Sequence, residues 1–262
     1  MTFLSIVTVC RNNLSGLLKT QASVERQLSR DFEWLVVDGA SDDGTLDHLK
    51  VIQHPRLKWV SEPDRGIYDA MNKGTLLATG KYIVYLNSGD CFASEDCVQR
   101  LRNEVKQNEP SPDLVYGACA REFSDGTQLL RKPRKIENAI RHTLPAIHQA
   151  TLFRREFLEI PPYSLRYRLC SDYYISAVSY RNNPRVVYLS WTVATFSVGG
   201  ESMKKIWLGI SDCWRIQRDV LGAGVLSRIV SASRRFINNR LLFLLHMSTS
   251  KNEANSEGKR VV

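Results

Sequence analysis

Short apolar runs alternate with longer amphipathic stretches over the first ninety residues of the chain. The apolar runs are rich in β-branched and aromatic side chains, end in polar turns, and cover residues 4–9, 34–37, 57–61 and 82–86. The stretches between them place apolar side chains at helical spacing and cover residues 14–24, 45–51 and 67–78. This alternation predicts βαβ units, a mostly parallel sheet, and ligands bound at the carboxyl ends of the strands.

The strand–helix rhythm loosens after residue 113. Further strands are predicted at 114–118, 128–132 and 185–189, and helices at 137–142, 154–158 and 172–180. Beyond Glu201 the pattern is almost wholly helical, with apolar faces over 207–221 and 225–245. We therefore expect three parts, which are an α/β domain at 1–203, a helical extension at 204–247 and a flexible tail at 248–262.

No stretch of the sequence is long enough to span a membrane. The longest run of aliphatic and aromatic residues near the C-terminus, residues 241–245, is far shorter than the ~20 residues that a spanning helix needs. The first residues lack the basic segment of a secretory signal. The cysteines are scattered without a C-x-x-C pair, which is typical of reduced thiols. These features predict a cytoplasmic protein.

Charge is unevenly divided along the chain. There are 36 Lys and Arg residues and 27 Asp and Glu residues, which gives a net charge of +9. Residues 1–120 contain 13 basic and 16 acidic side chains, so the remainder carries a net charge of +12. An acidic front suits metal or polar ligands, and a basic back suits anions. Nucleic acid is not an expected partner, because the basic residues form no recognisable groove-reading motif.

Acidic turns follow two of the predicted strands. Asp38 ends the second strand, Asp42 and Asp43 follow in the same loop, and Asp90 follows the fourth strand. The ends of neighbouring parallel strands lie close together, so these carboxylates can converge on one ligand. Hard oxygen donors there suit a nucleoside, or Mg²⁺ or Mn²⁺ held against a diphosphate. Asp-Gly and Ser-Asp are also common turn formers, but polar loops after three strands favour the ligand site.

A loop that contains Pro63 and Gly66 precedes the predicted helix at 67–78. Asp69 and Asn72 are three residues apart in that helix and share a face. The N-terminus of a helix capped by such a loop suits an anion or a sugar. A capped surface helix explains the same spacing, so the ligand interpretation depends on the rest of the pattern.

Together these motifs resemble the family 2 glycosyltransferases of the GT-A fold. Five segments in the family's order and spacing carry the resemblance: residues 5–9 (SIVTV), 37–45 (VDGASDDGT), 62–74, 78–81 (ATGK) and 86–90 (LNSGD). Three more extend it to about residue 203: 148–151 (HQAT), 171–173 (SDY) and 196–202 (FSVGGES). Within the family, the chain looks most like bacterial enzymes of colanic-acid-type exopolysaccharide and lipopolysaccharide O-antigen assembly. The implied fold is a Rossmann-like, mixed but mostly parallel sheet flanked by helices, with a C-terminal helical extension.

The resemblance implies transfer of a sugar from a UDP- or GDP-sugar to an acceptor hydroxyl, with inversion at the anomeric carbon. The positions implied to bind the nucleotide sugar are Thr8, Arg11, Asp38, Asp64, Gly66, Asp69 and Asn72. Within this set, Asp38 is expected to contact the base or ribose, while Asp64 and Gly66 close over the nucleoside. Asp172 corresponds to the general base that deprotonates the acceptor hydroxyl. An N-cap after Ser171 is the alternative role of Asp172, and one residue can serve both.

Asp90 corresponds to the metal–diphosphate motif, so the resemblance implies a divalent cation, Mg²⁺ or Mn²⁺, as cofactor. The family's motif often reads Asp-X-Asp, but the stretch here is Asn87-Ser88-Gly89-Asp90. A single carboxylate predicts weaker metal binding that depends on the diphosphate itself. His148 is a further candidate as a metal ligand or acceptor contact, although a lone histidine is as often structural.

The basic second half points to the acceptor. Four basic side chains lie in one short segment: Arg131, Lys132, Arg134 and Lys135. Enzymes of the resembled type act on polyprenyl-diphosphate-linked glycans, so we expect this segment to face the acceptor's diphosphate. Arginines also alternate with apolar side chains over 225–245, which suits a helix lying on an anionic membrane. We therefore expect a peripheral protein on the inner face of the bacterial cytoplasmic membrane, with packing of these helices on the α/β domain as an equal alternative.

Two other functions share the predicted sheet. The missing first Asp of the metal motif allows a non-catalytic partner subunit that binds a nucleotide sugar within a glycosyltransferase complex. The presence of both Asp90 and Asp172 favours an enzyme over that alternative. A nucleotidyltransferase would need a glycine-rich triphosphate loop after the first strand, and the segment Cys10-Arg11-Asn12-Asn13 contains no glycine.

Overall fold

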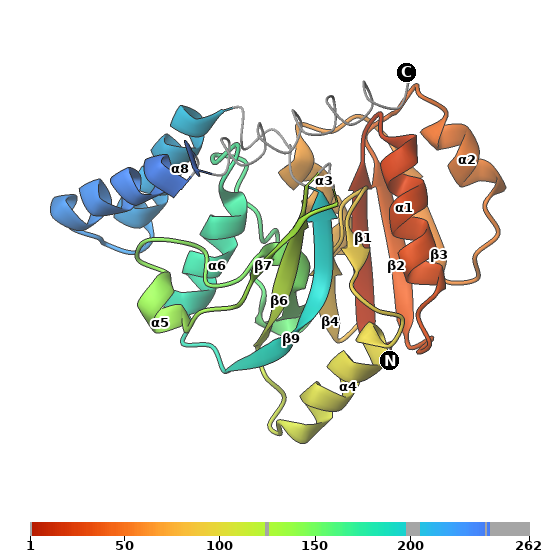
Figure 1. Cartoon of the computed structure of the whole chain (residues 1–262). Helices are drawn as coiled ribbons and strands as arrows, with labels where there is room; N and C mark the ends of the chain where they lie inside the picture. The colour runs from red at the N-terminus through yellow and green to blue at the C-terminus, as the bar shows by residue number, and fades with distance from the viewer. Residues whose placement is uncertain (1, 124–125, 198–204, 239, 242–262) are drawn as a thin grey trace, which may run out of the picture.

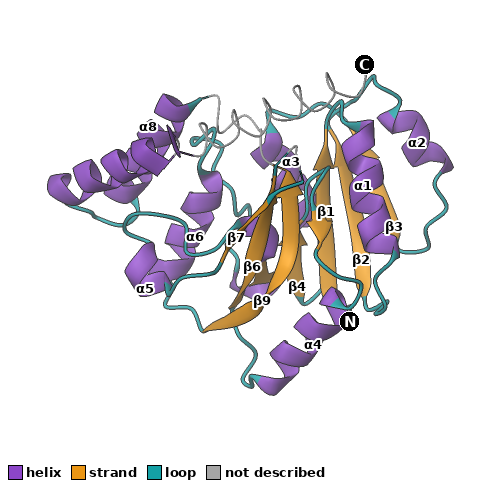
Figure 2. Cartoon of the chain, viewed as in Figure 1, coloured by secondary structure: helices purple, strands orange, loops and turns teal. Residues whose placement is uncertain are grey.

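The chain folds as a central β-sheet with helices on both faces (Figures 1 and 2). The computed structural model describes residues 2–123, 126–197, 205–238 and 240–241. The sheet has nine strands within these residues and contains both parallel and antiparallel pairs.

The first half of the sheet is parallel, as predicted. Its strands are β1 (Leu4–Cys10), β2 (Phe32–Asp38), β3 (Leu57–Ser61) and β4 (Tyr82–Tyr85). β1 lies between β2 and β4, and every residue of β1 and β2 is buried. In the register of the strands, Cys10 pairs with Asp38, which pairs in turn with Ser61. The polar turns therefore meet at one edge of the sheet.

The second half of the sheet is mixed. Its strands are β5 (Cys91–Phe92), β6 (Leu114–Glu122), β7 (Gln128–Arg131), β8 (Thr151–Arg154) and β9 (Val186–Ser197). β8 is antiparallel to both β4 and β6, so β6 runs in the direction of β4. The strand order is β3-β2-β1-β4-β8-β6-β9-β5, with β7 paired to β6.

Several elements differ from those predicted. Residues 154–158, predicted as a helix, contain the end of β8 and a 3-10 turn at Arg155–Phe157, because a strand of four residues is too short to show its period. β9 continues to Ser197, well beyond the predicted 185–189. The helix at Cys97–Gln107 was not predicted.

Two layers of helices cover the sheet. One face carries α1 (Leu14–Glu25), α2 (Thr45–Val51) and α4 (Cys97–Gln107). The other carries α3 (Ile67–Leu77), α5 (Ile136–Ala139), α6 (Ser171–Arg181) and α8 (Ile206–Asp219). Adjacent residues of β1 show the division, because Ile6 packs in the cluster with Leu17 of α1, and Val7 packs in the cluster with Met71 of α3.

The helical extension packs beside α6 (Figure 1). Cys213 and Ile216 of α8 are buried in the same cluster as Ile175 of α6. A further helix covers residues 225–238. No helix in the described ranges is long and apolar enough to cross a membrane. Residues 198–202 of the last sequence motif and the predicted tail at 248–262 lie outside the described residues.

Candidate active site

The loops that follow β1 and β2 are fastened to each other at the carboxyl edge of the sheet. The Asn12 N–H donates to Ser41 Oγ at 2.8 Å, and the Asp42 N–H donates to Asn12 Oδ1 at 3.0 Å. Asp43 accepts a hydrogen bond from the Leu14 N–H at 2.8 Å, which joins the second loop to the start of α1. The two loops therefore form one continuous rim along this edge of the sheet. Asp43 stabilises the second loop through its hydrogen bond to the start of α1.

Asp38 is fully buried beneath this rim. Its carboxylate accepts hydrogen bonds from the Ser41 hydroxyl, from the Ser41 N–H at 3.1 Å and from Ser61 Oγ at 2.6 Å. These contacts tie the end of β2 to β3. The structure thus places Asp38 below the site, without exposed surface, and its contact with a base or ribose stays a prediction.

Three of the predicted nucleotide-binding residues lie together around Gly39. A Cβ atom added at Gly39 would lie 2.3 Å from Asp64 Oδ2 and 3.2 Å from Arg11 Cδ, so a larger residue would push these side chains apart. Asp64 Oδ1 accepts a hydrogen bond from the Gly66 N–H at 2.8 Å. Gly66 has a φ of +115°, which favours glycine, and it immediately precedes α3. Arg11, Asp64 and Gly66 are therefore brought to one place.

Two predicted nucleotide-binding residues instead face the protein interior. Thr8 is fully buried, and its Oγ1 accepts a hydrogen bond from Trp34 Nε1 at 3.0 Å. The Asn72 amide both donates to the Tyr163 carbonyl at 2.8 Å and accepts from the Tyr163 N–H at 2.9 Å. The pleat of β1 turns Thr8 inward, and the buried face of α3 commits Asn72 to a neighbouring loop, so nucleotide binding by these two residues stays a prediction.

Asp69 holds the loop that precedes α3. Its two carboxylate oxygens accept from the Arg65 N–H and from Arg65 Nη2, both at 3.0 Å. The hydrogen bond from the Arg65 guanidinium holds the pKa of Asp69 below its usual range. Asp69 therefore shapes the loop that carries Asp64 and Gly66 rather than standing open to a ligand.

Asp90 lies in a tight turn after β4. Its Oδ2 accepts from the Asn87 N–H and from Gln149 Nε2, both at 3.0 Å. Thr20 of α1 supports the turn, because its hydroxyl donates to the Asp90 carbonyl at 2.8 Å and accepts from the Gly89 N–H at 2.9 Å. Burial raises the pKa of Asp90 to about 7, although the hydrogen bond from Gln149 acts to lower it. A cation at this carboxylate would offset the cost of burying its charge.

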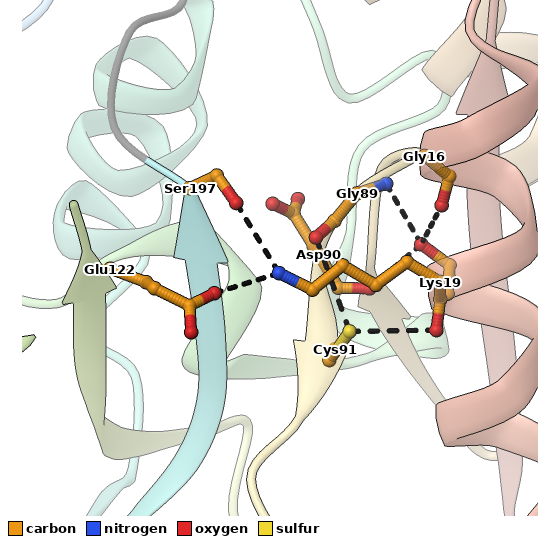
Figure 3. Close-up of polar contacts among 8 residues, drawn as sticks. Gly16, Lys19, Gly89, Asp90, Cys91, Glu122 and Ser197 are labelled. Carbon is orange, nitrogen blue, oxygen red and sulfur yellow. Dashed lines mark hydrogen bonds and ion pairs between the residues drawn. The ribbon is translucent and has the colours of Figure 1, made fainter. Parts of the chain in front are cut away.

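Lys19 places a positive charge beside Asp90. Figure 3 shows its side chain reaching from α1 toward the ends of β6 and β9. The ammonium lies 2.7 Å from Glu122 Oε2 and 3.5 Å from Ser197 Oγ. The Lys19 charge lowers the pKa of Asp90, although burial outweighs it. This residue was not among those predicted, because it lies within α1 and belongs to no sequence motif.

Asp172 stands in the first turn of α6, and 19% of its side chain is exposed. Its Oδ1 accepts from the Tyr173 N–H at 2.8 Å and from the Tyr68 hydroxyl at 3.4 Å. Burial, together with the Asp172 charge, raises the pKa of Tyr68 well above its usual range, so the phenol stays protonated and donates. Asp172 is therefore both fixed to its helix and open to a ligand.

A single 3-10 turn, η1 (His148–Ala150), connects the two candidate carboxylates. His148 Nδ1 lies 4.0 Å from Asp172 Oδ2. The next residue, Gln149, donates to Asp90. The structure therefore brings the predicted general base and the predicted metal carboxylate to opposite ends of one short connection.

The environment of His148 defines its protonation. Its Nε2 lies 3.4 Å from Asn87 Nδ2. Burial lowers the pKa of His148, although the Asp172 charge opposes this, so the ring is neutral at pH 7. The Asn87 amide on one side and the Asp172 carboxylate on the other fix the position of the ring.

Oxygen donors around Asp90 fit a divalent cation. Asn87 Oδ1 and Gln149 Oε1 are buried and have no hydrogen-bond partner in the structure. Amide and carboxylate oxygens are ligands that Mg²⁺ and Mn²⁺ accept. Within the described part of the chain, no three His, Cys, Asp or Glu side chains gather in a way that could hold a metal. The fit therefore depends on one carboxylate and neutral oxygens.

The four basic residues predicted to meet the acceptor do not share one environment. Three are exposed in the loop after β7: Lys132, Arg134 and Lys135. Arg131 is partly buried, and its Nη2 donates to the Leu144 carbonyl at 2.7 Å and to Thr143 Oγ1 at 3.3 Å. Burial and the neighbouring guanidinium of Arg121 lower the pKa of Arg131 to about 10.

Comparison of sequences identifies the family. A sequence model of Glycosyl transferase family 2 matches residues 5–176. A PGL/p-HBAD biosynthesis glycosyltransferase of Mycobacterium bovis (strain BCG / Pasteur 1173P2) is 35% identical over 210 residues, which cover 75% of this chain and 77% of that protein. The chondroitin synthase of Escherichia coli is 30% identical over 106 residues, which cover 40% of this chain and 15% of that protein.

Comparison of structures confirms the expected fold. The S. aureus TarS 1–349 structure in complex with UDP-GlcNAc superposes with a TM-score of 0.68 at 16% identity, over 92% of this chain and 73% of that one. A mannosyltransferase from Pyrobaculum calidifontis in complex with GDP-Man and Mn²⁺ superposes with a TM-score of 0.64 at 16% identity, over 96% and 75%. The chain therefore belongs to glycosyltransferase family 2 and is a glycosyltransferase with the GT-A fold.

Proposed function

We propose that this glycosyltransferase moves a sugar from a nucleoside diphosphate sugar to an acceptor hydroxyl, with inversion at the anomeric carbon. The observation that carries the proposal is the connection of Asp172 to Asp90 through His148 and Gln149. In-line displacement needs a base on one side of the sugar and a stabilised diphosphate on the other. The two carboxylates at the ends of η1 supply a group for each side.

Asp172 is the base of the proposed reaction. It takes the proton of the acceptor hydroxyl as the hydroxyl oxygen attacks the anomeric carbon. The Tyr68 hydroxyl and the Tyr173 N–H orient Oδ1. His148 Nδ1 lies 4.0 Å from Oδ2 and helps to align the carboxylate.

The donor binds at the carboxyl ends of β1 to β4. Arg11, Asp64 and Gly66 receive the nucleoside around Gly39, where only a small residue leaves room. Asp90, with the free amide oxygens of its neighbours, would hold Mg²⁺ or Mn²⁺, which when bound neutralises the diphosphate leaving group. Nucleotide sugars bound to structures of the same fold, UDP-GlcNAc on TarS and GDP-Man on the Pyrobaculum enzyme, support this placement.

The acceptor of the proposed reaction is a polyprenyl-diphosphate-linked glycan of bacterial surface polysaccharide synthesis, met at the inner face of the cytoplasmic membrane. The exposed basic loop after β7 supports an anionic acceptor. The helix at 225–238 supports a membrane surface, because it exposes large apolar side chains on one side: Leu226, Ile229, Val230 and Ile237.

Turnover of UDP- and GDP-sugars by the full chain tests the proposal. We expect one sugar nucleotide of a panel to raise the melting temperature and to be hydrolysed slowly in the presence of Mn²⁺. EDTA should abolish the hydrolysis. Failure of every member of the panel to bind would contradict the proposal, and binding without transfer to any supplied acceptor would instead indicate a partner subunit.

A further inference from the structure

The helix at 225–238 presents two opposite faces. Arg228, Ser231 and Arg235 are spaced at i, i+3 and i+7 and share the face that meets the rest of the protein. Ser231 is buried, and its hydroxyl donates to the His142 carbonyl at 3.1 Å. Gln217 of α8, also buried, donates to Ser231 Oγ at 2.6 Å. This face is therefore locked to the α/β core by specific polar contacts.

The hydrogen bonds of Ser231 place Arg235, one helical turn further along, against α6. The Arg235 guanidinium lies over the Tyr173 ring, 4.9 Å from its centroid. Tyr173 directly follows Asp172, and the Asp172 charge acts on Arg235. A residue far outside the part of the chain matched by the family model is thus held beside the proposed base.

Two nitrogens of Arg235 have no partner. Nε and Nη2 are buried and make no hydrogen bond in the structure. A buried donor without an acceptor is destabilising, and more so where the group is charged. The residue as a whole keeps some exposed surface, although these two nitrogens do not. An anion at this position would satisfy both donors.

Further guanidinium groups lie near Arg131. The charges of Arg121, Arg134 and Arg235 all act on Arg131 and help lower its pKa. No carboxylate of the described residues lies within ion-pair distance of any of these four arginines. Asp172 is the one negative side chain whose charge acts on both Arg131 and Arg235. Like charges collected without an ion-paired carboxylate are typical of a site for a multiply charged anion.

We infer that Arg131 and Arg235, with Arg121 and Arg134 around them, bind a phosphate or diphosphate group of the acceptor. This inference depends on the proposed function, since Asp172 marks the acceptor side of the site. In the proposed function the donor's diphosphate lies at Asp90, and the side chain whose positive charge acts on Asp90 is Lys19. The donor's and the acceptor's phosphate groups would therefore meet different basic side chains. Arginine is suited to this task, since its planar fork donates two parallel hydrogen bonds to phosphate oxygens. The C-terminal helix thereby completes the acceptor site.

Calorimetric titration with inorganic pyrophosphate tests the inference. The full chain is first titrated with UDP, and then with pyrophosphate in the presence of saturating UDP. We expect pyrophosphate still to bind, and Arg235→Met to weaken its binding about tenfold or more, as loss of a charge-assisted bond implies. Arg234→Met is the matched control, because Arg234 is the exposed neighbour on the same helix and its loss removes the same charge.

The outcomes separate the inference from the proposed function. Competition between UDP and pyrophosphate, or equal weakening by Arg234→Met, overturns the inference while leaving UDP binding intact. Failure to bind UDP at all counts against the proposed function instead. If Arg235→Met does not fold, Arg235→Lys keeps the charge and loses the fork, and it should still weaken pyrophosphate binding severalfold. Unchanged binding by a folded Arg235→Lys or Arg235→Met variant also overturns the inference.

Farnesyl diphosphate in place of pyrophosphate distinguishes the two sources of the group. Tighter binding of farnesyl diphosphate than of pyrophosphate supports a lipid-linked acceptor, since the prenyl chain adds apolar contact. Equal affinities for the two probes support a phosphorylated acceptor without a lipid. With either probe, Arg235→Met should weaken binding by the same factor.

Discussion

His148 Nδ1 lies 4.0 Å from Asp172 Oδ2, and the Asp172 charge raises the pKa of His148 against the effect of burial. If Asp172 is the general base, Asp172→Asn removes proton transfer but leaves the donor site in place. We expect the rate of sugar transfer to fall about 10²- to 10⁴-fold, with the affinity for UDP unchanged within twofold. Asp47→Asn, at an exposed carboxylate of α2, is the control and should retain full activity. Wild-type turnover by a folded Asp172→Asn protein would remove Asp172 from the role of base.

His148 should act through Asp172 rather than directly on the substrate. We expect His148→Gln to lower kcat about tenfold, because the carboxylate loses the group that faces its second oxygen. In the Asp172→Asn background the same change should have less than a twofold effect, since the partner that it orients is gone. Steady-state kinetics of the two single variants and the double variant measure this. Multiplicative effects would show that the residues act independently.

Asn87 belongs to the stretch Asn87-Ser88-Gly89-Asp90, which corresponds to the family's metal motif and holds a single carboxylate. Its Oδ1 is buried without a hydrogen-bond partner, near Asp90. We expect Asn87→Asp to tighten Mn²⁺ binding about tenfold in the presence of UDP, because a second carboxylate supplies charge to a hard cation. Titration of Mn²⁺ followed by electron paramagnetic resonance measures the affinity. Asn108→Asp, at an exposed position just after α4, is the control, and an equal gain there would point to charge alone.

The repeating part of the fold follows directly from the sequence. Fully apolar runs such as 34–37 mark buried parallel strands, and the acidic turns after them meet at one edge of the sheet. The site is only partly predictable, because a motif identifies a residue but not the direction of its side chain. Thr8 and Asp64 both belong to motifs, yet the pleat of β1 buries Thr8 while the loop before α3 leaves Asp64 facing Arg11.

Contacts between distant segments are the part that the sequence does not predict. Tyr68 and Gln149 lie inside recognised motifs, but their roles depend on Asp172 and Asp90, which are 104 and 59 residues away. Lys19 and Arg235 lie in ordinary helical patterns with no local signal. Their importance comes from packing, which places α1 beside the Asp90 turn and the helix at 225–238 beside α6.

Glu33 gives the fold a defined dependence on pH. Burial alone would raise its pKa, but hydrogen bonds from the Thr79 N–H, the Ser5 hydroxyl and Lys58 lower the pKa to about 2. The unfolded-state pKa is higher, at ~4.3, so this carboxylate stabilises the fold above that pH. The contribution, of the order of 3 kcal/mol, should be lost as the pH falls from about 5 to 2.

Glu33→Gln should remove this part of the pH dependence. We expect the variant to melt well below the wild type at pH 7, with the difference narrowing below pH 4. Thermal unfolding followed by circular dichroism from pH 2 to pH 7 measures this. Glu95→Gln, at an exposed position, should follow the wild-type curve. A constant difference between Glu33→Gln and the wild type across the range would contradict the assignment.

The apolar outer face of the helix at 225–238 should determine membrane association. Leu226 is 80% exposed, and burial of such a side chain in a lipid surface is worth about 1.5–3 kcal/mol. We expect the wild type to bind vesicles of phosphatidylglycerol, and Leu226→Glu to weaken that binding about tenfold or more. Leu28→Glu is the matched control, because Leu28 is 63% exposed in the loop after α1, on a different part of the molecule. Sedimentation with vesicles measures the bound fraction. Equal loss in both variants would assign the effect to added negative charge, and no loss in Leu226→Glu would show that this face does not meet the membrane.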